Sequence, residues 1–240
     1  MQESIYSRCR RKVHRELVSL LTDRRWRCIG IDAEWVGSAS GGAWVDLSSL
    51  SRNSVVYSFG LAFEISFDRE IIKRTGGCSV FGYDPDPRSI QWLRREDIYL
   101  PPQMKIVQLG LAAEAGIHRF GVTDPEKMSG SMILDGYEEF IEAEFKTLEQ
   151  LMEENGHSVI DYVKMDIEGA EFDLLNDWLG RKYSPPIKQL WIEFHPETKN
   201  MTIEEVECLV RSLATIGFVP VKRSYRRSPK HFLLQNIRVK

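Results

Sequence analysis

The chain contains 240 residues, of which 42% are hydrophobic, and it carries a net charge of −3 with a pI near 6.0. This length and apolar content predict one domain with a single substantial core. The negative charge excludes a general attraction to polyanions, so any contact with nucleic acid must rest on a local basic cluster. The cysteines (Cys9, Cys28, Cys78 and Cys208) are too scattered for a zinc site or a disulfide scaffold.

No segment has the pattern of membrane insertion or secretion. The apolar runs fall short of the roughly 20 residues that a membrane helix requires. The N-terminus lacks the uninterrupted apolar stretch of a signal peptide. We therefore expect a cytoplasmic protein, or one from the lumen of the secretory pathway if an N-terminal anchor has been removed.

Residues 1–52 are expected to form an N-terminal helix and a glycine-rich lead-in that pack on the core. Between residues 6 and 21, apolar side chains recur at helical spacing among arginines and lysines, which predicts an amphipathic helix. Residues 31–53 are rich in glycine and serine and are interpreted as a loop. We expect this loop to be able to fold over a cofactor pocket.

Residues 53–240 alternate between strand and helix patterns, which predicts a mostly parallel sheet with crossover helices. A less regular excursion is expected at about residues 118–145. The last two strands lie close together in the sequence and predict an antiparallel hairpin at one sheet edge. The predicted fold is therefore α/β and Rossmann-like, with helices on both faces of the sheet. Strands are predicted at residues 55–58, 80–84, 105–110, 159–166, 188–194, 218–223 and 231–239, and helices at 67–75, 89–96, 147–154, 170–179 and 203–216.

A turn suited to a nucleotide follows the first of these strands. Gly60 permits a tight turn and a close approach of the backbone to a ligand. Asp84 ends the next strand, where a carboxylate can bond ribose hydroxyls. Asp84 also begins the sequence Asp-Pro-Asp-Pro, which favours a turn, so both interpretations stay open. A single glycine departs from the GxGxxG pattern and disfavours a nicotinamide-dependent oxidoreductase.

Two buried strands end in acidic and imidazole side chains. The first delivers Asp166 and Glu168 and then turns through Gly169 into a helix. The second ends in Glu193 and His195, which alternation places on one face. Carboxyl ends of neighbouring parallel strands are where α/β sheets bind ligands, so we expect the functional site there. The alternative is structural, because carboxylates also favour turns and helix N-termini.

Lys164 lies inside an apolar strand, where an unpaired ammonium group is costly. It is therefore expected to pair with a carboxylate, for which Glu193 across the sheet is the candidate. Such a pair would orient the site.

These segments closely resemble the FkbM-type family of S-adenosylmethionine-dependent methyltransferases, in its eukaryotic, methyltransferase-like branch. The glycine-rich segment Val36–Val45 resembles the lead-in of that branch, and Val55–Asp68 and Val80–Pro85 resemble the cofactor loop and the acidic strand end of the family. The resemblance implies a class I methyltransferase fold with a seven-stranded sheet and assigns residues 53–240 to the methyltransferase domain. The residues that match the family signature are Lys164, Asp166, Glu168, Gly169 and Glu171, followed by Glu193, Phe194 and His195.

The resemblance also implies where S-adenosylmethionine binds. Residues in and after the first strand would line its methionine part, the carboxylate that ends the second strand would bind the ribose, and residues 110–114 would contact the adenine. Glu64 has a second interpretation, as a favourable charge at the start of the following helix. The implied cofactor-binding residues are Tyr57, Gly60, Glu64, Asp84, Leu111 and Asp166.

Methyl transfer to an alcohol needs a group that removes the proton of a poor nucleophile. His195 is the candidate general base because imidazole titrates near neutral pH. Alternatively, Mg²⁺ or another divalent cation, bound by acidic side chains that include Glu168, would lower the hydroxyl pKa. The two hypotheses are compatible. The predicted catalytic residues are Lys164, Asp166 and His195, and the predicted metal ligands are Asp166 and Glu193.

The sequence thus predicts an S-adenosylmethionine-dependent O-methyltransferase that acts on a hydroxyl of a sugar or small glycosylated metabolite. The substrate class is implied only by the resemblance. One alternative is methyl transfer to nucleic acid through the basic run between Lys222 and Lys230, which we interpret more readily as a solvated hairpin loop. The others are a nicotinamide-dependent oxidoreductase and a non-enzymatic interaction module.

Overall fold

The protein is described by a computed structural model, which covers residues 31–122, 130–132, 139–223 and 230–239. The amphipathic helix predicted for residues 6–21 lies outside these ranges. None of the described helices is long and apolar enough to cross a lipid bilayer.

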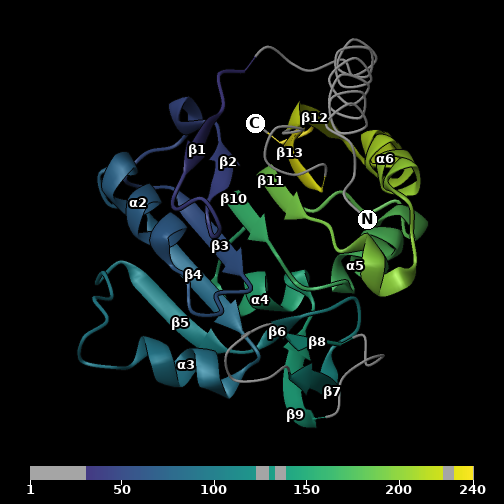
Figure 1. The fold of residues 1–240 in the computed structure, drawn as a ribbon. Helices are drawn as coiled ribbons and strands as arrows, with labels where there is room; N and C mark the ends of the chain where they lie inside the picture. Colours follow the sequence, from purple (N-terminus) through teal and green to yellow (C-terminus); the bar gives the residue numbers. More distant parts are fainter. Residues whose placement is uncertain (1–30, 123–129, 133–138, 224–229, 240) are drawn as a thin grey trace, which may run out of the picture.

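A seven-stranded sheet forms the centre of the protein (Figure 1). Its strand order is β12-β13-β11-β10-β3-β4-β5, and the five strands from β11 to β5 run parallel. β13 is antiparallel to both of its neighbours, which gives the C-terminal hairpin. The predicted fold class is therefore confirmed. The strands are β3 (Val55–Phe59), β4 (Ser79–Asp84), β5 (Met104–Gln108), β10 (Ile160–Met165), β11 (Ile187–Glu193), β12 (Phe218–Arg223) and β13 (His231–Asn236).

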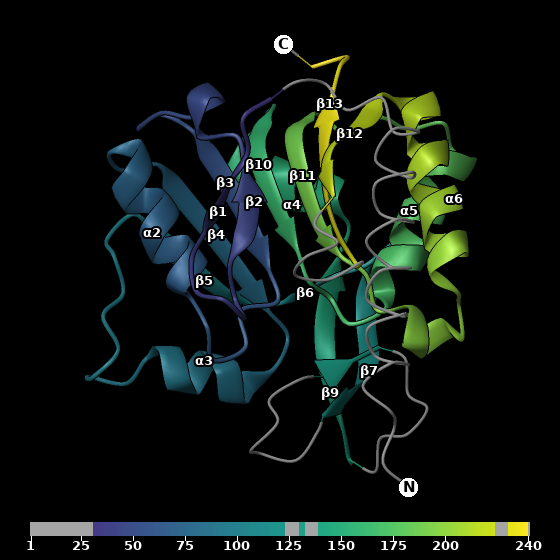
Figure 2. The ribbon, with the colours of Figure 1, turned by 45° about the horizontal axis from the view of Figure 1, so that its top comes forward.

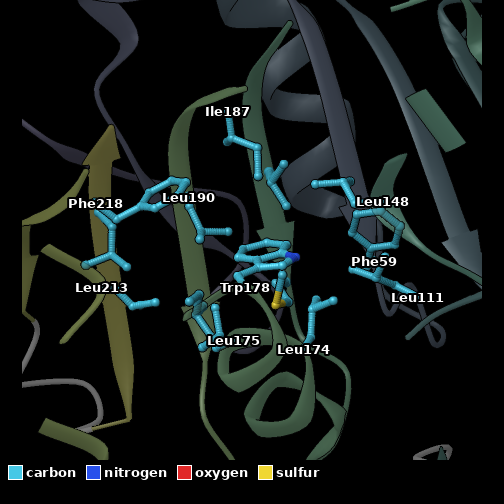
Figure 3. Packing of buried hydrophobic residues seen from close by; sticks show 14 of the residues in the cluster. Phe59, Leu111, Leu148, Leu174, Leu175, Trp178, Ile187, Leu190, Leu213 and Phe218 are labelled. Carbon is cyan, nitrogen blue, oxygen red and sulfur yellow. The ribbon is translucent and has the colours of Figure 1, made fainter. Parts of the chain in front are cut away.

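Helices cover both faces of this sheet (Figure 2). On one face, Trp178 is fully buried among aliphatic and aromatic side chains from the sheet and helices (Figure 3). On the other face, Phe67 and Ile71 pack against Val56 and Tyr162. The side chains of adjacent residues in the central strands point to opposite faces of the sheet, as in any β-strand. The first face carries α4 (Leu148–Asn155), α5 (Ala170–Gly180) and α6 (Ile203–Ser212), and the second carries α2 (Ser66–Thr75) and α3 (Pro87–Leu93).

The lead-in is a β-hairpin, so the loop predicted for residues 31–53 is wrong in part. β1 (Glu34–Val36) pairs antiparallel with β2 (Ala43–Val45), and the glycines lie in the turn between them. The hairpin packs on the face of the sheet that α2 covers, with Trp35 at 6.5 Å from Trp191 between ring centroids. It therefore shields the sheet instead of the cofactor pocket. The hairpin was not predicted because its strands are too short to show a clear alternation of apolar and polar residues.

The irregular excursion predicted for residues 118–145 is also corrected, because it is a small β-sheet. Its order is β6-β9-β7-β8, and it lies beyond the carboxyl ends of the central strands (Figure 1). The alternating Ala143 and Phe145 of β9 turn a buried face toward Phe120 and Val122. The strands are β6 (Gly110–Leu111), β7 (Gly116–Val122), β8 (Gly130–Ser131) and β9 (Glu139–Lys146).

Gln189 of β11 forms hydrogen bonds with the segment that follows the lead-in hairpin. Replacing Gln189 tests how much these bonds stabilise the fold. Its buried amide accepts a hydrogen bond from Asp46 N and donates one to Asp46 O, each at 2.9 Å. Gln189→Ala leaves both backbone groups unsatisfied, so we expect the free energy of unfolding to fall by about 1–3 kcal/mol. Urea denaturation measures this loss. Gln91→Ala, at an exposed position of α3, is the matched control and should stay within about 0.5 kcal/mol. If both variants lost the same free energy of unfolding, the hydrogen bonds of Gln189 would not stabilise the fold.

Candidate active site

A pocket opens at the carboxyl edge of the central sheet, where β3, β4 and β10 end. About 670 Å³ of space lies within it, part of which is open solvent. Gly60, Asp84 and Asp166 line it from the strand ends. Phe120 and Phe145 line it from the small sheet. The polar lining thus comes from the strand ends, and the small sheet adds its aromatic side chains to those of Phe59 and Tyr83 on the central strands.

Gly60 marks the closest approach between the turn after β3 and the end of β10. Its φ is 79°, and a Cβ atom there would lie 1.8 Å from the carbonyl oxygen of Asp166. Only glycine fits such a position. Gly60 N donates to the Tyr83 carbonyl at 3.0 Å, and Asp166 N donates to the Phe59 carbonyl at 3.2 Å. These contacts join three strand ends around the pocket.

Asp84 serves the turn after β3 as well as the pocket. Its Oδ2 accepts hydrogen bonds from Leu61 N at 3.0 Å and Ala62 N at 2.7 Å, and its Oδ1 accepts one from Asp86 N at 2.8 Å. Burial raises the pKa of Asp84, and these hydrogen bonds oppose the rise. A hydrogen bond with Ser89 also lowers this pKa, and Asp84 lines the pocket as well. Both interpretations of Asp84 are therefore compatible in this structure.

The small sheet adds pocket residues that were not predicted from the sequence. Phe120, Met132 and Phe145 line the pocket together with the predicted Leu111. Phe145 packs so closely on Gly110 that a Cβ atom there would lie 2.1 Å from its ring. The alternation of apolar residues along β9 is the signal that would have indicated a strand here.

Two predicted cofactor residues lie elsewhere. Tyr57 is fully buried, and its hydroxyl lies 2.8 Å from His157 Nδ1 in the core, so the predicted cofactor contact is corrected to a packing role. Glu64 accepts hydrogen bonds from Ser66 N at 2.6 Å and Ser38 Oγ at 3.0 Å. Burial opposes ionisation of Glu64, but these bonds outweigh it and lower its pKa. Glu64 thus agrees with its second interpretation, as a charge at the start of α2.

Asp166, Glu168 and His195 come together beside the pocket. His195 Nε2 lies 3.6 Å from Asp166 Oδ1 and 3.6 Å from Glu168 Oε2. The two carboxylates also line the pocket. Glu168 has a φ of 51°, a left-handed conformation that costs a residue other than glycine about 1–3 kcal/mol. The hydroxyl of Ser131 donates to the carbonyl of Glu168 and holds this conformation.

Lys164 and Glu193 are not partners, which corrects the predicted pair. Lys164 is buried, with its Nζ 3.5 Å from Asp166 Oδ2 and 5.5 Å from the centre of the Trp191 ring. Glu193 Oε1 instead lies 3.2 Å from His231 Nε2. Burial opposes ionisation of Glu193, but His231 outweighs it and lowers the pKa of Glu193. His231 was not predicted, because it lies on β13, 38 residues beyond its partner.

The predicted role of His195 as general base is not supported by its surroundings. Burial alone would lower the pKa of His195, but Glu171, Glu168 and Asp166 outweigh burial and raise it to about 9. An imidazole with this pKa carries its proton at neutral pH and cannot accept another. Burial also raises the pKa of Glu168 to about 7, and that of Asp166 above its usual value. The proton-accepting groups of this cluster are therefore its carboxylates.

The predicted metal pair is brought together only in part. Asp166, Glu168 and His195 each place one donor atom within 4.8 Å of the others, in the only such group among the described residues. Glu193 is not a member of this group. The second side chain near Asp166 is therefore Glu168.

The strand order with a single antiparallel strand, β13, and the pocket at the ends of β3 and β4 define a class I S-adenosylmethionine-dependent methyltransferase. The model of the methyltransferase FkbM domain matches residues 54–213. The chain therefore belongs to the FkbM methyltransferase family, and the hypothesis of a nicotinamide-dependent oxidoreductase is not retained.

Solved structures give more distant likenesses, and no curated protein matches the chain. A fibrillarin pre-rRNA processing protein of Methanococcus jannaschii is 11% identical over 87% of this chain and 84% of its own, with a TM-score of 0.44. A precorrin-6y C5,15-methyltransferase of Geobacter metallireducens is 14% identical over 79% and 80% of the two chains, with a TM-score of 0.37. At these values neither protein indicates an acceptor for this chain.

Gly60→Ala tests the contact between the turn and β10. The new Cβ atom would collide with the Asp166 carbonyl, so we expect a loss of stability beyond the strain of positive φ, and weaker binding of S-adenosylhomocysteine. Gly156→Ala is the matched control, because Gly156 has a φ of 71° but nothing within 4 Å of its Cβ position. Urea denaturation and calorimetry measure the two effects. If the control loses as much stability and affinity as Gly60→Ala, the contact does not shape the pocket.

Proposed function

We propose that this methyltransferase transfers a methyl group to a hydroxyl of a sugar or a small glycosylated metabolite. The observation that carries the proposal is the group formed by Asp166, Glu168 and His195 at the pocket wall. A neutral hydroxyl is a poor nucleophile, so its methylation needs a group that takes its proton or lowers its pKa. Acceptors that are already good nucleophiles, such as free amines, need no such group. Sugars as the class of acceptor rest on the family resemblance.

The pocket fits S-adenosylmethionine in three respects. Asp84 lines it at the end of β4, where a carboxylate can meet the ribose. Leu111, Phe120 and Phe145 form an apolar wall suited to the adenine. Asp166 at the end of β10 favours positive charge. When bound, S-adenosylmethionine supplies an electrophilic methyl group on a positively charged sulfur.

The side chains of this protein would prepare the acceptor. Asp166 and Glu168 can accept hydrogen bonds from a hydroxyl and from its neighbours on a sugar. Lys164 stabilises Asp166 in its charged form, because it opposes the effect of burial on the pKa of that carboxyl. His195 lies 3.6 Å from an oxygen of each carboxylate, where its positive charge favours their ionised form. The chain thus positions the hydroxyl and receives or displaces its proton.

Turnover with defined acceptors tests the proposal. The full chain is incubated with S-adenosylmethionine and, separately, with methyl glycosides, a primary amine and a short RNA. We expect S-adenosylhomocysteine to form with at least one glycoside, and the glycoside to gain the mass of one methyl group. Methylation of the amine or the RNA without any glycoside would contradict the proposal. Rates with RNA that fall steeply with salt would favour the nucleic-acid alternative. The basic run that would serve it extends through residues 224–229, which lie outside the described residues.

Asp84→Asn tests the cofactor assignment without an acceptor. The amide retains the size of the side chain but loses the charge and one acceptor oxygen. We expect the affinity for S-adenosylhomocysteine to fall about 10- to 100-fold, since a hydrogen bond to a charged group contributes about 1.5–3 kcal/mol. Calorimetry measures the change. Asp97→Asn is the control, because Asp97 is exposed and pairs with Arg95 away from the pocket. An unchanged affinity in Asp84→Asn would remove the ribose role.

A further inference from the structure

We propose that Asp166, Glu168 and His195 bind one divalent cation of the first transition row. The ligand atoms are Asp166 Oδ1, Glu168 Oε2 and His195 Nε2, and the imidazole would release its Nε2 proton to solvent when the ion binds. This inference rests on the proposed function, since the cation would act on the acceptor hydroxyl in the same site. It replaces the predicted pair of Asp166 and Glu193 with three ligands.

The spacing of the three atoms suits a cation better than a direct contact. His195 Nε2 lies 3.6 Å from each carboxylate oxygen, whereas hydrogen bonds from N–H to O span about 2.7–3.2 Å. A tetrahedral ion with bonds of about 2.1 Å separates its ligands by about 3.4 Å. The separation of His195 Nε2 from each carboxylate oxygen is therefore close to that in a tetrahedral site, and the two carboxylate oxygens lie within 4.8 Å of each other.

His195 gives an independent indication of a ligand. The residue is only 8% exposed, and its Nε2 lies 3.6 Å from an oxygen of each of two carboxylates, which is beyond hydrogen-bond distance. Its Nδ1 lies 3.4 Å from Glu171 Oε1. A carboxylate beside the second ring nitrogen is the arrangement that orients metal-binding histidines. The imidazole is thus directed toward the position of the proposed ion.

Glu168 is held in place while its carboxylate remains available. Its backbone has a φ of 51° and is fixed by the hydroxyl of Ser131, which comes from the small sheet. Within the described part of the chain, no group donates a hydrogen bond to its carboxylate. Glu171 differs, because both of its oxygens accept backbone hydrogen bonds. The carboxylate oxygens of Glu168 are therefore available to bind an ion, whereas those of Glu171 already accept backbone hydrogen bonds.

The surrounding charge also favours a cation. Asp166, Glu168, Glu171 and Glu193 lie close enough to influence one another, and the nearest lysine, Lys164, contacts Asp166 alone among them. Buried carboxylates are costly unless positive charge compensates them. One divalent ion beside His195 would supply that charge.

The ligand set indicates the type of ion and its role. Mg²⁺ prefers oxygen ligands throughout, whereas a set of one imidazole and two carboxylates suits ions such as Mn²⁺ and Zn²⁺. Three protein ligands leave coordination positions open for water or a substrate oxygen. A hydroxyl bound there would lose its proton more readily, since the ion stabilises the resulting oxyanion.

Titration of the metal-free full chain with Mn²⁺ tests the site. Electron paramagnetic resonance of the free ion and calorimetry give the stoichiometry and the affinity. We expect the wild type to bind one equivalent, and Glu168→Gln and His195→Gln to bind it at least about 10-fold more weakly. Glu153→Gln, on the exposed side of α4, is the control and should bind as the wild type does. Retained binding of S-adenosylhomocysteine shows that each variant is folded.

The outcomes separate the ion from the methyltransferase function. Wild-type protein that binds S-adenosylhomocysteine but no Mn²⁺ would overturn the cation site and leave the proposed function standing. Equal Mn²⁺ affinity in the wild type, Glu168→Gln and His195→Gln would place the ion elsewhere and would also overturn the inference. Absence of S-adenosylhomocysteine binding in the wild type would contradict the cofactor assignment, whatever the result with Mn²⁺.

Discussion

Glu171 is a fully buried carboxylate, and the geometry of the active site depends on its two hydrogen bonds. Its Oε2 accepts the N–H of Gly169, and its Oε1 accepts the N–H of His195, each at 2.7 Å. A buried carboxylate without partners would cost several kcal/mol, which these charge-assisted bonds offset. Because Gly169 follows β10 and His195 follows β11, one side chain ties the two strand ends together. These two hydrogen bonds therefore help to set the separation between Asp166 and His195.

Hydrogen bonds to backbone groups also connect the other strand ends. Asp84 at the end of β4 accepts backbone N–H groups from the turn after β3, and Gly60 in that turn lies against the carbonyl of Asp166. Backbone groups that face the pocket are thereby satisfied within the protein, as buried polar groups must be. Glu168 is the contrast, since its carboxylate is left for chemistry while its backbone is held in a strained conformation. Turns held by hydrogen bonds thus surround the carboxylate of Glu168, which itself accepts none from the described residues.

Much of this arrangement was predictable, because buried parallel strands are apolar runs with clear ends. β10 and β11 carried both the family signature and the acidic strand ends, so the position of the site followed from the sequence. The environment of His195 was not predictable, because its carboxylate neighbours lie more than 20 residues away in the chain. The small sheet escaped prediction because its strands are short or half exposed. Tyr57 was misassigned because it was carried over from the family resemblance, which does not say which face of β3 meets the pocket.

The small sheet connects the pocket to the turn that carries Glu168, so a change in this sheet can alter the proposed active site. Phe120 and Phe145 line the pocket, while Ser131 donates its hydroxyl proton to the carbonyl of Glu168. Because Glu168 carries backbone strain, its conformation depends on that hydrogen bond as well as on the turn itself. Residues inserted between strands vary more freely than the sheet that supports them. A change in this insertion can therefore reach the carboxylate of Glu168 and leave the central sheet unaltered.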